Sequence, residues 1–499
     1  MDVPKTTPGG TQRPAADEGA AGSADRCPVD HTAAAAAPEA AASSPPAAIP
    51  ATELPGPQLH VLRQIWTYWK RQQDFMRECR ERYGSRFALT IRIPPKPLYV
   101  ISEAEDMKQM FLAPPDVLHT GNGSATLEKF TGQTGLAWLD EDEHKRRRKF
   151  LLPSMHGKAF QRIEASVNEM AGREVATWPQ GRVASLHPHI HRLTLNVIHE
   201  VIFGSAPTKV WDELIEVLLK MMHFNYRVAS TLMIHKMSPR AVRILTAIRP
   251  LGLHGFLKLR DRADALIAEA VSERRQSGVD GDDMLAVLLR ITHEDGSPLT
   301  AVEMRDEMMT IFLAGTESTA SGIAWALENL SREDAIRERL VAEIDAGESD
   351  EYLTATVYEI LRLRPPVSQI IPREVMKPIE IGGVRYEPGM ALMASAYLLH
   401  HNPDLYPDPY AFRPERFLGT KPGIYTWIPF GGGRTRCLGA EIGIVEMKVV
   451  LRAVLSRYEL RRDDPEPEAS RSKSIVTVPA KGARLALRTR KPEATLAGG

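Results

Sequence analysis

The chain has 499 residues, of which 43% are hydrophobic and 25% are charged, a composition typical of a soluble globular protein. Its 63 basic and 63 acidic side chains cancel, so net charge gives no general attraction to nucleic acid or to an acidic membrane. Three cysteines in a chain of this length exclude a disulfide framework and fit a reducing compartment.

The first 50 residues differ in composition from the rest of the chain. They include 15 Ala and 8 Pro but no aromatic residue, so they bury too little apolar surface to offset the entropy of ordering. We expect a disordered Ala/Pro-rich tail over residues 1–50 and a flexible C-terminus over residues 491–499. Cys27 and His31 in the tail have no further ligand residues beside them, and we interpret the pair as fortuitous.

No targeting or membrane segment is evident. The N-terminus lacks the basic patch and apolar core of a secretory signal, and no apolar run is long enough to span a bilayer. We therefore expect a cytoplasmic protein with no transmembrane anchor and no nucleic-acid partner.

Strand-like segments lie near both ends of the folded part. RFALTIRI (86–93) and KPLYVIS (96–102) are separated by a Pro-rich turn, and Gly382-Gly383 marks a hairpin turn in a later strand region. Between about residues 140 and 365 the pattern is helical. The sequence thus predicts a mainly α fold with a small β-sheet region, forming a single large domain over residues 51–490.

The longest predicted helix begins at a capping box formed by Thr300 and Glu303 and runs to about Leu330. Its middle, MMTIFLAGTESTASGIAWAL, is largely apolar on every face, which predicts a buried helix. Glu317 and Ser318 interrupt this apolar stretch. A buried acid is costly unless it is satisfied or used, so the pattern leaves open a polar patch bonded within the helix and a functional acid.

One of the three cysteines lies in FGGGRTRCLGAEIG, directly before an apolar helical pattern formed by Ile442, Val445 and Val449. A thiolate at a helix N-terminus is stabilised by the helix dipole and by free backbone N–H groups. The glycines on both sides of Cys437 remove side chains where the backbone passes close to something flat. We therefore expect Cys437 to lie at a helix start, in a chemically active position.

Several roles of such a sulfur can be compared. A nucleophile needs a nearby His base, and the sequence has none locally. A zinc site needs further Cys or His ligands, which are also missing locally. A single thiolate suffices as the protein ligand of haem iron, because the porphyrin supplies the other four ligands.

The loop FGGGRTRCLG resembles the cysteine loop of the cytochrome P450 superfamily, F-x-x-G-x-R-x-C-x-G. The matching residues are Phe430, Gly433, Cys437 and Gly439.

The loop departs from the family pattern at one position. Thr435 stands where the family has an Arg that commonly meets a haem propionate. We expect Arg434 and Arg436, on either side, to serve a propionate or a docking partner instead.

Other motifs of the family follow in the same order along the chain. Glu359 and Arg362 in EILR, with Arg416 in FRPERF, are similar to the family's structural Glu–Arg–Arg cluster. AGTEST resembles the central-helix motif: Gly315 and Glu317 match it, with Ala314 before them, while Ser318 replaces the usual Thr.

The resemblance also implies how the cofactor is held. His144 and Arg148, four residues apart in HKRRR, and Arg373 in IIPREV correspond to family positions that meet haem propionates. The cofactor-binding residues expected from the resemblance are therefore Cys437, His144, Arg148, Arg373, Phe430, Thr435, Arg434 and Gly439, with Cys437 as the metal ligand of haem b.

The resemblance further implies a haem-thiolate monooxygenase that inserts one atom of O2 into a substrate. Glu317 and Ser318 would supply protons, and Gly315 would open a groove in the central helix. Electrons would come from a separate ferredoxin or flavodoxin with its NAD(P)H reductase. Arg434, Arg436 and the basic run 145–149 are the expected docking charges.

The substrate is expected to be a small hydrophobic molecule of terpenoid, steroid, fatty acid or polyketide type. Residues 114–138 and 219–237 should contribute to the pocket, together with apolar and Met side chains. The predicted lining residues are Met221, Met222, Phe224, Met233, Met237, Phe312, Leu313, Val367, Ile370 and Ile371.

Two alternatives stay open from the sequence. A P450-type peroxygenase or isomerase would need no electron donor, and the departures at Thr435 and Ser318 are compatible with it. A non-catalytic haem sensor would keep Cys437 but would have little use for Glu317 and Ser318.

Overall fold

A computed structural model of the chain describes residues 48–92, 95–121, 128–204, 210–228, 253–278, 281–473 and 475–490. The predicted disordered tail and flexible C-terminus fall almost wholly outside these ranges and stay predictions.

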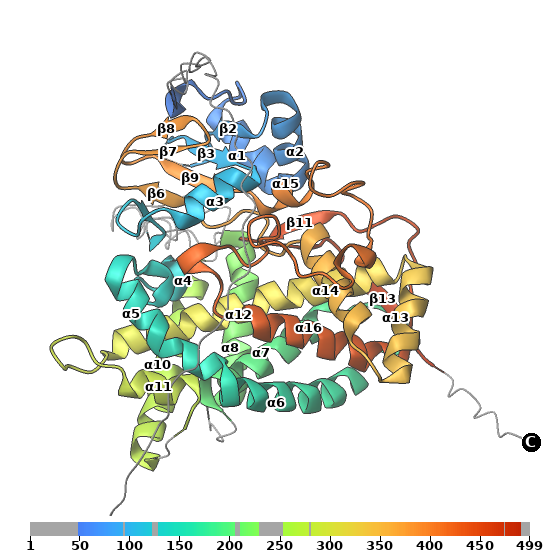
Figure 1. Cartoon of the computed structure of the whole chain (residues 1–499). Coiled ribbons are helices and arrows are strands. Elements are labelled where there is room, and N and C mark those ends of the chain that lie inside the picture. The colour runs from blue at the N-terminus through green and yellow to red at the C-terminus, as the bar shows by residue number, and fades with distance from the viewer. Residues whose placement is uncertain are drawn as a thin grey trace, which may run out of the picture. The chain divides into compact units, whose positions relative to one another are not determined.

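Helices make up most of the described chain, so the predicted mainly α fold with a small β-sheet region is confirmed (Figure 1). The α-helices are α1 (Val61–Lys70), α2 (Gln72–Tyr83), α3 (Ala104–Leu112), α4 (Glu128–Thr131), α5 (Glu141–Leu151), α6 (Gly157–Ala176), α7 (His187–Phe203), α8 (Trp211–Val228), α10 (Leu253–Ser277), α11 (Met284–Arg290), α12 (Ala301–Leu330), α13 (Asp334–Ala346), α14 (Glu351–Leu363), α15 (Ala396–His400) and α16 (Ala440–Leu455).

The strands form small separate sheets. Their bounds are β1 (Ile49–Pro50), β2 (Arg86–Leu89), β3 (Leu98–Ile101), β4 (Leu118–His119), β5 (Val183–Ser185), β6 (Arg373–Val375), β7 (Ile379–Ile381), β8 (Val384–Tyr386), β9 (Ala391–Ala394), β10 (Tyr458–Arg461), β11 (Ser470–Lys473), β12 (Val476–Pro479) and β13 (Arg484–Thr489).

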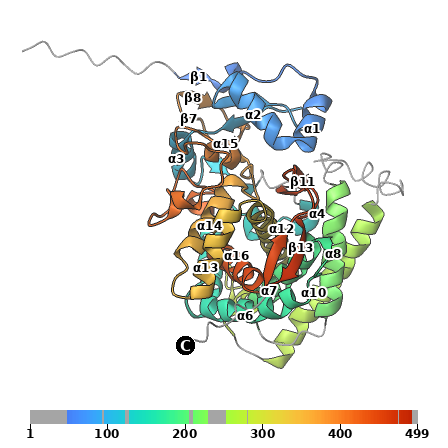
Figure 2. The ribbon, with the colours of Figure 1, turned by 90° about the vertical axis from the view of Figure 1, so that its right-hand side faces the viewer.

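The largest sheet combines strands from distant parts of the sequence, in the order β2-β3-β9-β6-β4. The central strands β3 and β9 are parallel and every residue in them is buried, which explains their continuous apolar sequences. The predicted hairpin is also present, because β7 and β8 pair across Gly382 and Gly383, whose φ angles are +59° and +73°. Figure 2 shows these strands beside α2 and α3, away from α6 and α7.

Helix α12 runs through the helical part and contacts α7, α14 and α16 (Figure 1). The side chain of Thr300 accepts a hydrogen bond from the Glu303 N–H, and Glu303 bonds back to Thr300, so the predicted capping box is present. Trp325 lies fully buried near the other end and donates its Nε1–H to the carbonyl of Thr477 at 3.1 Å. The capping box defines the N-terminus of α12, and the Trp325 bond ties its other end to β12.

Candidate active site

A cavity of about 380 Å³ lies between the middle of α12 and the cysteine loop before α16. Two segments more than 100 residues apart in sequence meet there, and each contributes residues that the sequence singled out. From α12 these are Gly315, Glu317 and Ser318; from the loop they are Phe430, Thr435, Cys437 and Gly439; from other elements they are His144, Arg148 and Arg373.

Cys437 borders this cavity. Its backbone N–H donates to the carbonyl of Phe430 at 3.0 Å, which closes the loop. The side chain is exposed to the cavity, and burial among the surrounding residues raises the pKa of the thiol. The N–H of Gly439 and the cations Arg148 and Arg436 act in the opposite direction and favour the thiolate.

Helix α16 begins at Ala440, so Cys437 precedes the helix by three residues instead of forming its first turn. Gly439 is the N-cap residue, and its N–H is the one that reaches the sulfur. The predicted stabilisation by free N–H groups therefore comes from the turn before the helix.

The glycines of the loop serve different purposes. A Cβ on Gly432 would come within 2.4 Å of the Phe111 ring, and one on Gly433 within 2.4 Å of the Phe111 carbonyl oxygen. These two glycines allow the loop to pack on α3. Gly431 and Gly433 also adopt positive φ angles of +67° and +63°, which favour glycine. A Cβ on Gly439 would have no neighbour within 4 Å, so here alone the missing side chain leaves open space.

Two arginines and a histidine that line the cavity have no ion-pair partner among the described residues. Arg373 is 1% exposed and donates to the Met110 carbonyl at 2.8 Å, and burial lowers its pKa to about 9. Burial and the charge of Arg148 lower the pKa of His144 to about 4, so His144 is neutral near pH 7. In the described part of the chain, no carboxylate lies within 4.0 Å of Arg148 or Arg373, although the charge of Asp140 acts on Arg373 from farther away. Such a set fits a flat group that brings its own carboxylates, as haem does through its propionates.

Thr435, the residue that departs from the family pattern, contacts Arg373. Its Oγ1 accepts a hydrogen bond from the Arg373 guanidinium at 2.8 Å. Arg434 instead donates to the carbonyls of Ala113 at 2.7 Å and Leu118 at 2.6 Å and is not among the cavity-lining residues. Its expected role as a cofactor ligand therefore stays a prediction, while its observed bonds tie the loop to the segment after α3.

Glu317 lies against three nitrogen-bearing side chains from two other elements. Its Oε2 is 2.6 Å from His191 Nε2, and its Oε1 is 3.5 Å from His187 Nε2 and 3.7 Å from Lys473 Nζ. Burial opposes ionisation of Glu317, but the contacts with His191 and His187 outweigh it and hold its pKa well below the usual value. Glu317 is therefore ionised. The interpretation of this segment as a polar patch is partly correct, because Glu317 has polar partners, but they lie on α7 and β11 and not within α12.

The neighbours of Glu317 in the motif also have local partners. Ser318 Oγ donates to the Ala314 carbonyl at 2.6 Å, a bond within the helix. A Cβ on Gly315 would come within 2.2 Å of Ile198 Cδ1 on α7, so close packing of two helices explains this glycine. Helix α12 is continuous across the motif, and the expected groove at Gly315 stays a prediction.

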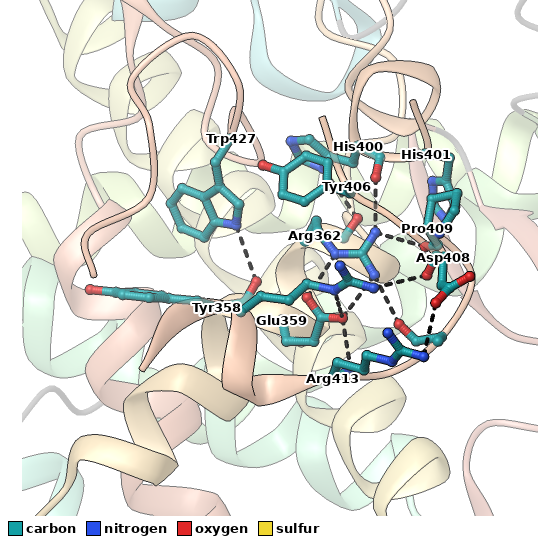
Figure 3. Close-up of polar contacts among 12 residues, drawn as sticks. Tyr358, Glu359, Arg362, His400, His401, Tyr406, Asp408, Pro409, Arg413 and Trp427 are labelled. Atoms are coloured by element: carbon teal, nitrogen blue, oxygen red, sulfur yellow. Dashed lines mark hydrogen bonds and ion pairs between the residues drawn. The ribbon is translucent and has the colours of Figure 1, made fainter. Parts of the chain in front are cut away.

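The Glu–Arg–Arg cluster forms as the sequence predicts (Figure 3). Glu359 and Arg362 are fully buried and joined by two hydrogen bonds of 2.7 and 2.8 Å, and Arg416 Nε lies 3.3 Å from Glu359. Arg362 also donates to the carbonyls of His400 and Pro409, both at 2.8 Å. Because every charge has a partner, this cluster is structural.

The cluster is linked to the cysteine loop through His400, which sequence reasoning missed. Burial and the charge of Arg362 lower its pKa to about 3, so the ring is neutral. Its Nδ1 lies 3.2 Å from the Arg362 carbonyl, and its Nε2 accepts the Ile428 N–H at 2.8 Å. Trp427 adds a second link by donating to the Tyr358 carbonyl at 3.1 Å.

The apolar part of the cavity agrees only partly with the predicted lining. Met222, Leu313, Val367, Ile370 and Ile371 line it, as do parts of the segment 114–138. Met221 and Phe312 are core residues, fully buried and outside the lining set. The side chain of Phe224, together with Met233 and Met237, lies outside the described residues.

The basic run on α5 divides between two environments. Lys145 and Lys149 are exposed, whereas Arg147 is buried and lies 3.3 Å from Glu303 and 3.5 Å from Glu307. Arg147 therefore belongs to the core and cannot be part of a docking surface.

Further residues of the site were missed by sequence reasoning: His187, His191, Lys473 and Glu446. The spacing of His187 and His191, four apart in HPHIH, indicates one helix face and could have drawn attention to the pair. Glu446, an acid within an apolar stripe nine residues after Cys437, was a similar signal. Nothing in the sequence indicates that Lys473 approaches Glu317.

Comparisons with known proteins agree with this geometry. A model of the cytochrome P450 family matches residues 50–487. The chain belongs to the cytochrome P450 family. It is 33% identical over 452 residues to the cytochrome P450 135B1 of Mycobacterium tuberculosis, covering 88% of this chain and 93% of that protein. It is 34% identical to the cytochrome P450 137 of the same organism, covering 78% and 80%.

A solved structure shows the same fold. Cyanobacterial CYP120A1 with retinoic acid bound has a TM-score of 0.73 and 22% identity, over 86% of this chain and 96% of that chain. The present cytochrome P450 is a haem-thiolate monooxygenase: its cofactor is haem with a cysteine-ligated iron, and it uses O2 and electrons from a redox partner. None of the helices in the described ranges combines the length and apolar character required to cross a bilayer.

Proposed function

We propose that this cytochrome P450 holds haem b through the Cys437 thiolate and inserts one oxygen atom into a small hydrophobic molecule, by hydroxylation or epoxidation. The observation that supports this most directly is the placement of Cys437 and the α12 segment Ala314–Thr319 on one cavity, together with Arg148 and Arg373, which form no ion pair with any carboxylate of the described residues. Bound haem supplies the activation of dioxygen.

The residues around the cavity have distinct roles in this proposal. Arg148, Arg373 and the neutral His144 would hold the propionates of bound haem, and Thr435 orients Arg373. Phe430 and Gly439 shape the loop, with the Gly439 N–H tempering the charge on the sulfur. Glu317 and Ser318 move protons at the wall opposite Cys437.

The substrate class is inferred from the lining. Apart from the charged residues already described, the cavity wall is formed mainly by Leu, Ile, Val and Met side chains, which favour an apolar ligand, and Met222 adapts to irregular shapes. A molecule of terpenoid, steroid, fatty acid or polyketide type fits this chemistry. The retinoic acid bound to the fold neighbour is an isoprenoid of similar character.

Electrons are proposed to come from a ferredoxin or flavodoxin. Arg436 is exposed and its charge reaches Cys437, and Lys145 and Lys149 on α5 are also exposed. Positive charge near the cysteine side suits an acidic partner. Charge reversal at Lys145 and Lys149 should lower the second-order rate of reduction and weaken its salt dependence.

The central test is spectroscopic. The reduced carbon-monoxide complex of the wild type should show the red-shifted Soret band of a thiolate ligand, and Cys437→Ala should lose it. Cys79→Ala, at a buried cysteine in the core around β2 and β3, is the matched control and should keep the band. A Cys437→Ala variant that retains the band would overturn the ligand assignment.

Substrate class is tested by adding lipophiles to the oxidised protein and following the Soret band, then assaying product with a surrogate ferredoxin system. Product formed with hydrogen peroxide and no reductant would identify the peroxygenase alternative. Product formed with neither oxidant nor reductant would identify the isomerase. Binding without product under all conditions would favour the sensor.

A further inference from the structure

The acid that lines the cavity from α12 is enclosed from behind by imidazoles. His187 and His191 lie one turn apart on α7, with ring centroids 5.2 Å apart, and both Nε2 atoms face the Glu317 carboxylate. The histidines do not line the cavity, whereas Glu317 does. Glu317 therefore separates the two imidazoles from the space in which a substrate would bind.

This arrangement makes Glu317 an unsuitable proton reservoir. A group that donates protons efficiently has a pKa near the working pH, and the contacts with His191 and His187 hold the pKa of Glu317 well below that range. Imidazole is the side-chain group whose ordinary pKa lies between those of carboxylates and amines, so it can carry a proton that an acid of this kind has already lost. Burial lowers the pKa of His187, and the hydrogen bond and charge of Glu317 oppose that shift.

We propose that His187 and His191 form the proton reservoir behind Glu317, and that Glu317 is the relay that passes their protons into the cavity. This inference rests on the proposed function of Glu317 at the cavity wall. A proton leaves His191 Nε2 and binds Glu317 Oε2, and the N–H bond breaks as the O–H bond forms. Glu317 then releases the proton into the cavity, and the imidazole is reprotonated from solvent.

The geometry supports each end of this path. The His191–Glu317 separation of 2.6 Å is that of a charge-assisted contact, although neither ring nitrogen meets the carboxylate at a good hydrogen-bond angle. His187 has the more exposed side chain of the two, at 8% against 3%, and lies at the first turn of α7, so it is the member of the pair nearer to solvent.

The other charges facing this group come from β11. Lys473 Nζ lies 3.7 Å from Glu317 Oε1, and Arg471 adds positive potential at Lys473. Burial lowers the pKa of Lys473, and the contact with Glu317 opposes that shift. Lys473 thus keeps the carboxylate anionic and in place between proton transfers, while the histidines exchange protons.

The experiment compares His191→Gln and His187→Gln with the control His189→Gln. His189 lies on the same helix between the two, but its ring packs near Trp178 and does not contact Glu317. With an identified substrate and a surrogate ferredoxin system, kcat, KM, peroxide release and the solvent deuterium isotope effect are measured from pH 6 to 9.

Loss of the reservoir should lower kcat of His191→Gln on the order of tenfold, below the usual effect of removing a general acid itself. KM should be unchanged, peroxide release should rise, and the solvent isotope effect should increase. The decline of wild-type kcat with rising pH should flatten in this variant. His187→Gln should show the same changes to a smaller extent, and His189→Gln none. An unaltered pH profile and isotope effect in His191→Gln would overturn the inference.

A second measurement does not depend on turnover. In the reduced carbon-monoxide complex, which is diamagnetic, 15N NMR of labelled histidine follows the titration of each ring. Glu317→Gln should shift the titration of two histidine signals, and those signals should be the ones missing from His187→Gln and His191→Gln. Identical titration in wild type and Glu317→Gln would also overturn the inference.

The two proposals fail in different ways. If the wild type lacks the thiolate Soret band, the proposed function fails before any histidine is tested. If the band is present and Glu317→Gln loses oxygen-dependent turnover while His191→Gln behaves as His189→Gln does, only the reservoir fails.

Discussion

Two clusters of buried charge hold the cysteine loop, and they differ in how their charge is balanced. In the first, Glu359 is paired with Arg362 and Arg416 inside the protein. In the second, Arg373 and Arg148 line the cavity without an ion pair among the described residues. The first cluster is complete within the chain, whereas the second requires anions that a cofactor brings. Charge balance therefore distinguishes a structural cluster from a binding site.

The largest loss of stability is expected from a substitution in the first cluster, whose charges are balanced within the protein. Arg362→Met leaves the Glu359 carboxylate buried without its main partner, which should cost about 3–5 kcal/mol of unfolding free energy. Urea unfolding of the holoprotein, followed by circular dichroism, measures this. The control is Arg173→Met, which breaks an exposed pair with Glu169 and should change stability by less than about 1 kcal/mol. A loss below about 1 kcal/mol for Arg362→Met would show that the cluster is not structural.

A substitution in the second cluster should weaken haem binding and leave the stability of the haem-free protein nearly unchanged. Arg373→Met should leave the stability of the haem-free protein within about 1 kcal/mol of wild type, because no internal ion pair is broken. Affinity for haem should fall by roughly 10- to 100-fold, the value of about 1.5–3 kcal/mol for a hydrogen bond to a charged group. Haem transfer to apomyoglobin measures the affinity, with the exposed Arg385→Met as control. Equal haem retention in both variants would contradict the comparison.

The sequence predicted the balanced cluster more completely than the cavity. Glu359, Arg362 and Arg416 were predicted because the acid and both of its cationic partners belong to the chain and lie in two short motifs, EILR and FRPERF. Cys437 and the α12 acid were also found, since their spacing in the sequence reflects local backbone geometry. The partners of Glu317 were missed, because His187, His191 and Lys473 come from α7 and β11, more than 100 residues away in either direction. Contacts of this kind depend on tertiary packing.

The purposes of the glycines illustrate the same limit. Gly315 was attributed to a groove, which stays a prediction, and Gly432 to clearance for a flat group; the structure adds Ile198 and Phe111 as the neighbours that a Cβ at each position would meet. A glycine in a sequence indicates that something passes close, but only the fold identifies the neighbour.

Glu446 is a third kind of buried ionisable group, an acid with no balancing cation among the described residues. It is 1% exposed, its Oε1 has no hydrogen-bond partner in the described part of the chain, and burial raises its pKa well above 4.5. The folded state thus retains a proton that the unfolded state loses above pH 4.5, so this group's contribution to stability falls as pH rises towards the folded pKa.

Glu446→Gln removes this titration. The stability of the variant relative to wild type should therefore grow as pH rises above 4.5, by up to about 1.4 kcal/mol per pH unit. Urea unfolding of both holoproteins at a series of pH values measures the difference. A difference that is constant with pH would mean that Glu446 is ionised in the folded protein and has a partner in solution.

The smallest effect is expected at Thr435, where the chain departs from its family. The hydroxyl accepts from Arg373 at 2.8 Å, and the second guanidinium nitrogen donates to Met110, so Thr435 fixes only one side of this cation. Thr435→Val keeps the shape and removes the acceptor, which should weaken haem binding by about 1 kcal/mol, or roughly fivefold. In the Arg373→Met background the same substitution should have no further effect, because the two residues act through one bond. Haem transfer, measured for the two single variants and for the double variant, completes this double-mutant cycle. Additive losses would show that Thr435 contacts the cofactor by itself and does not act through Arg373.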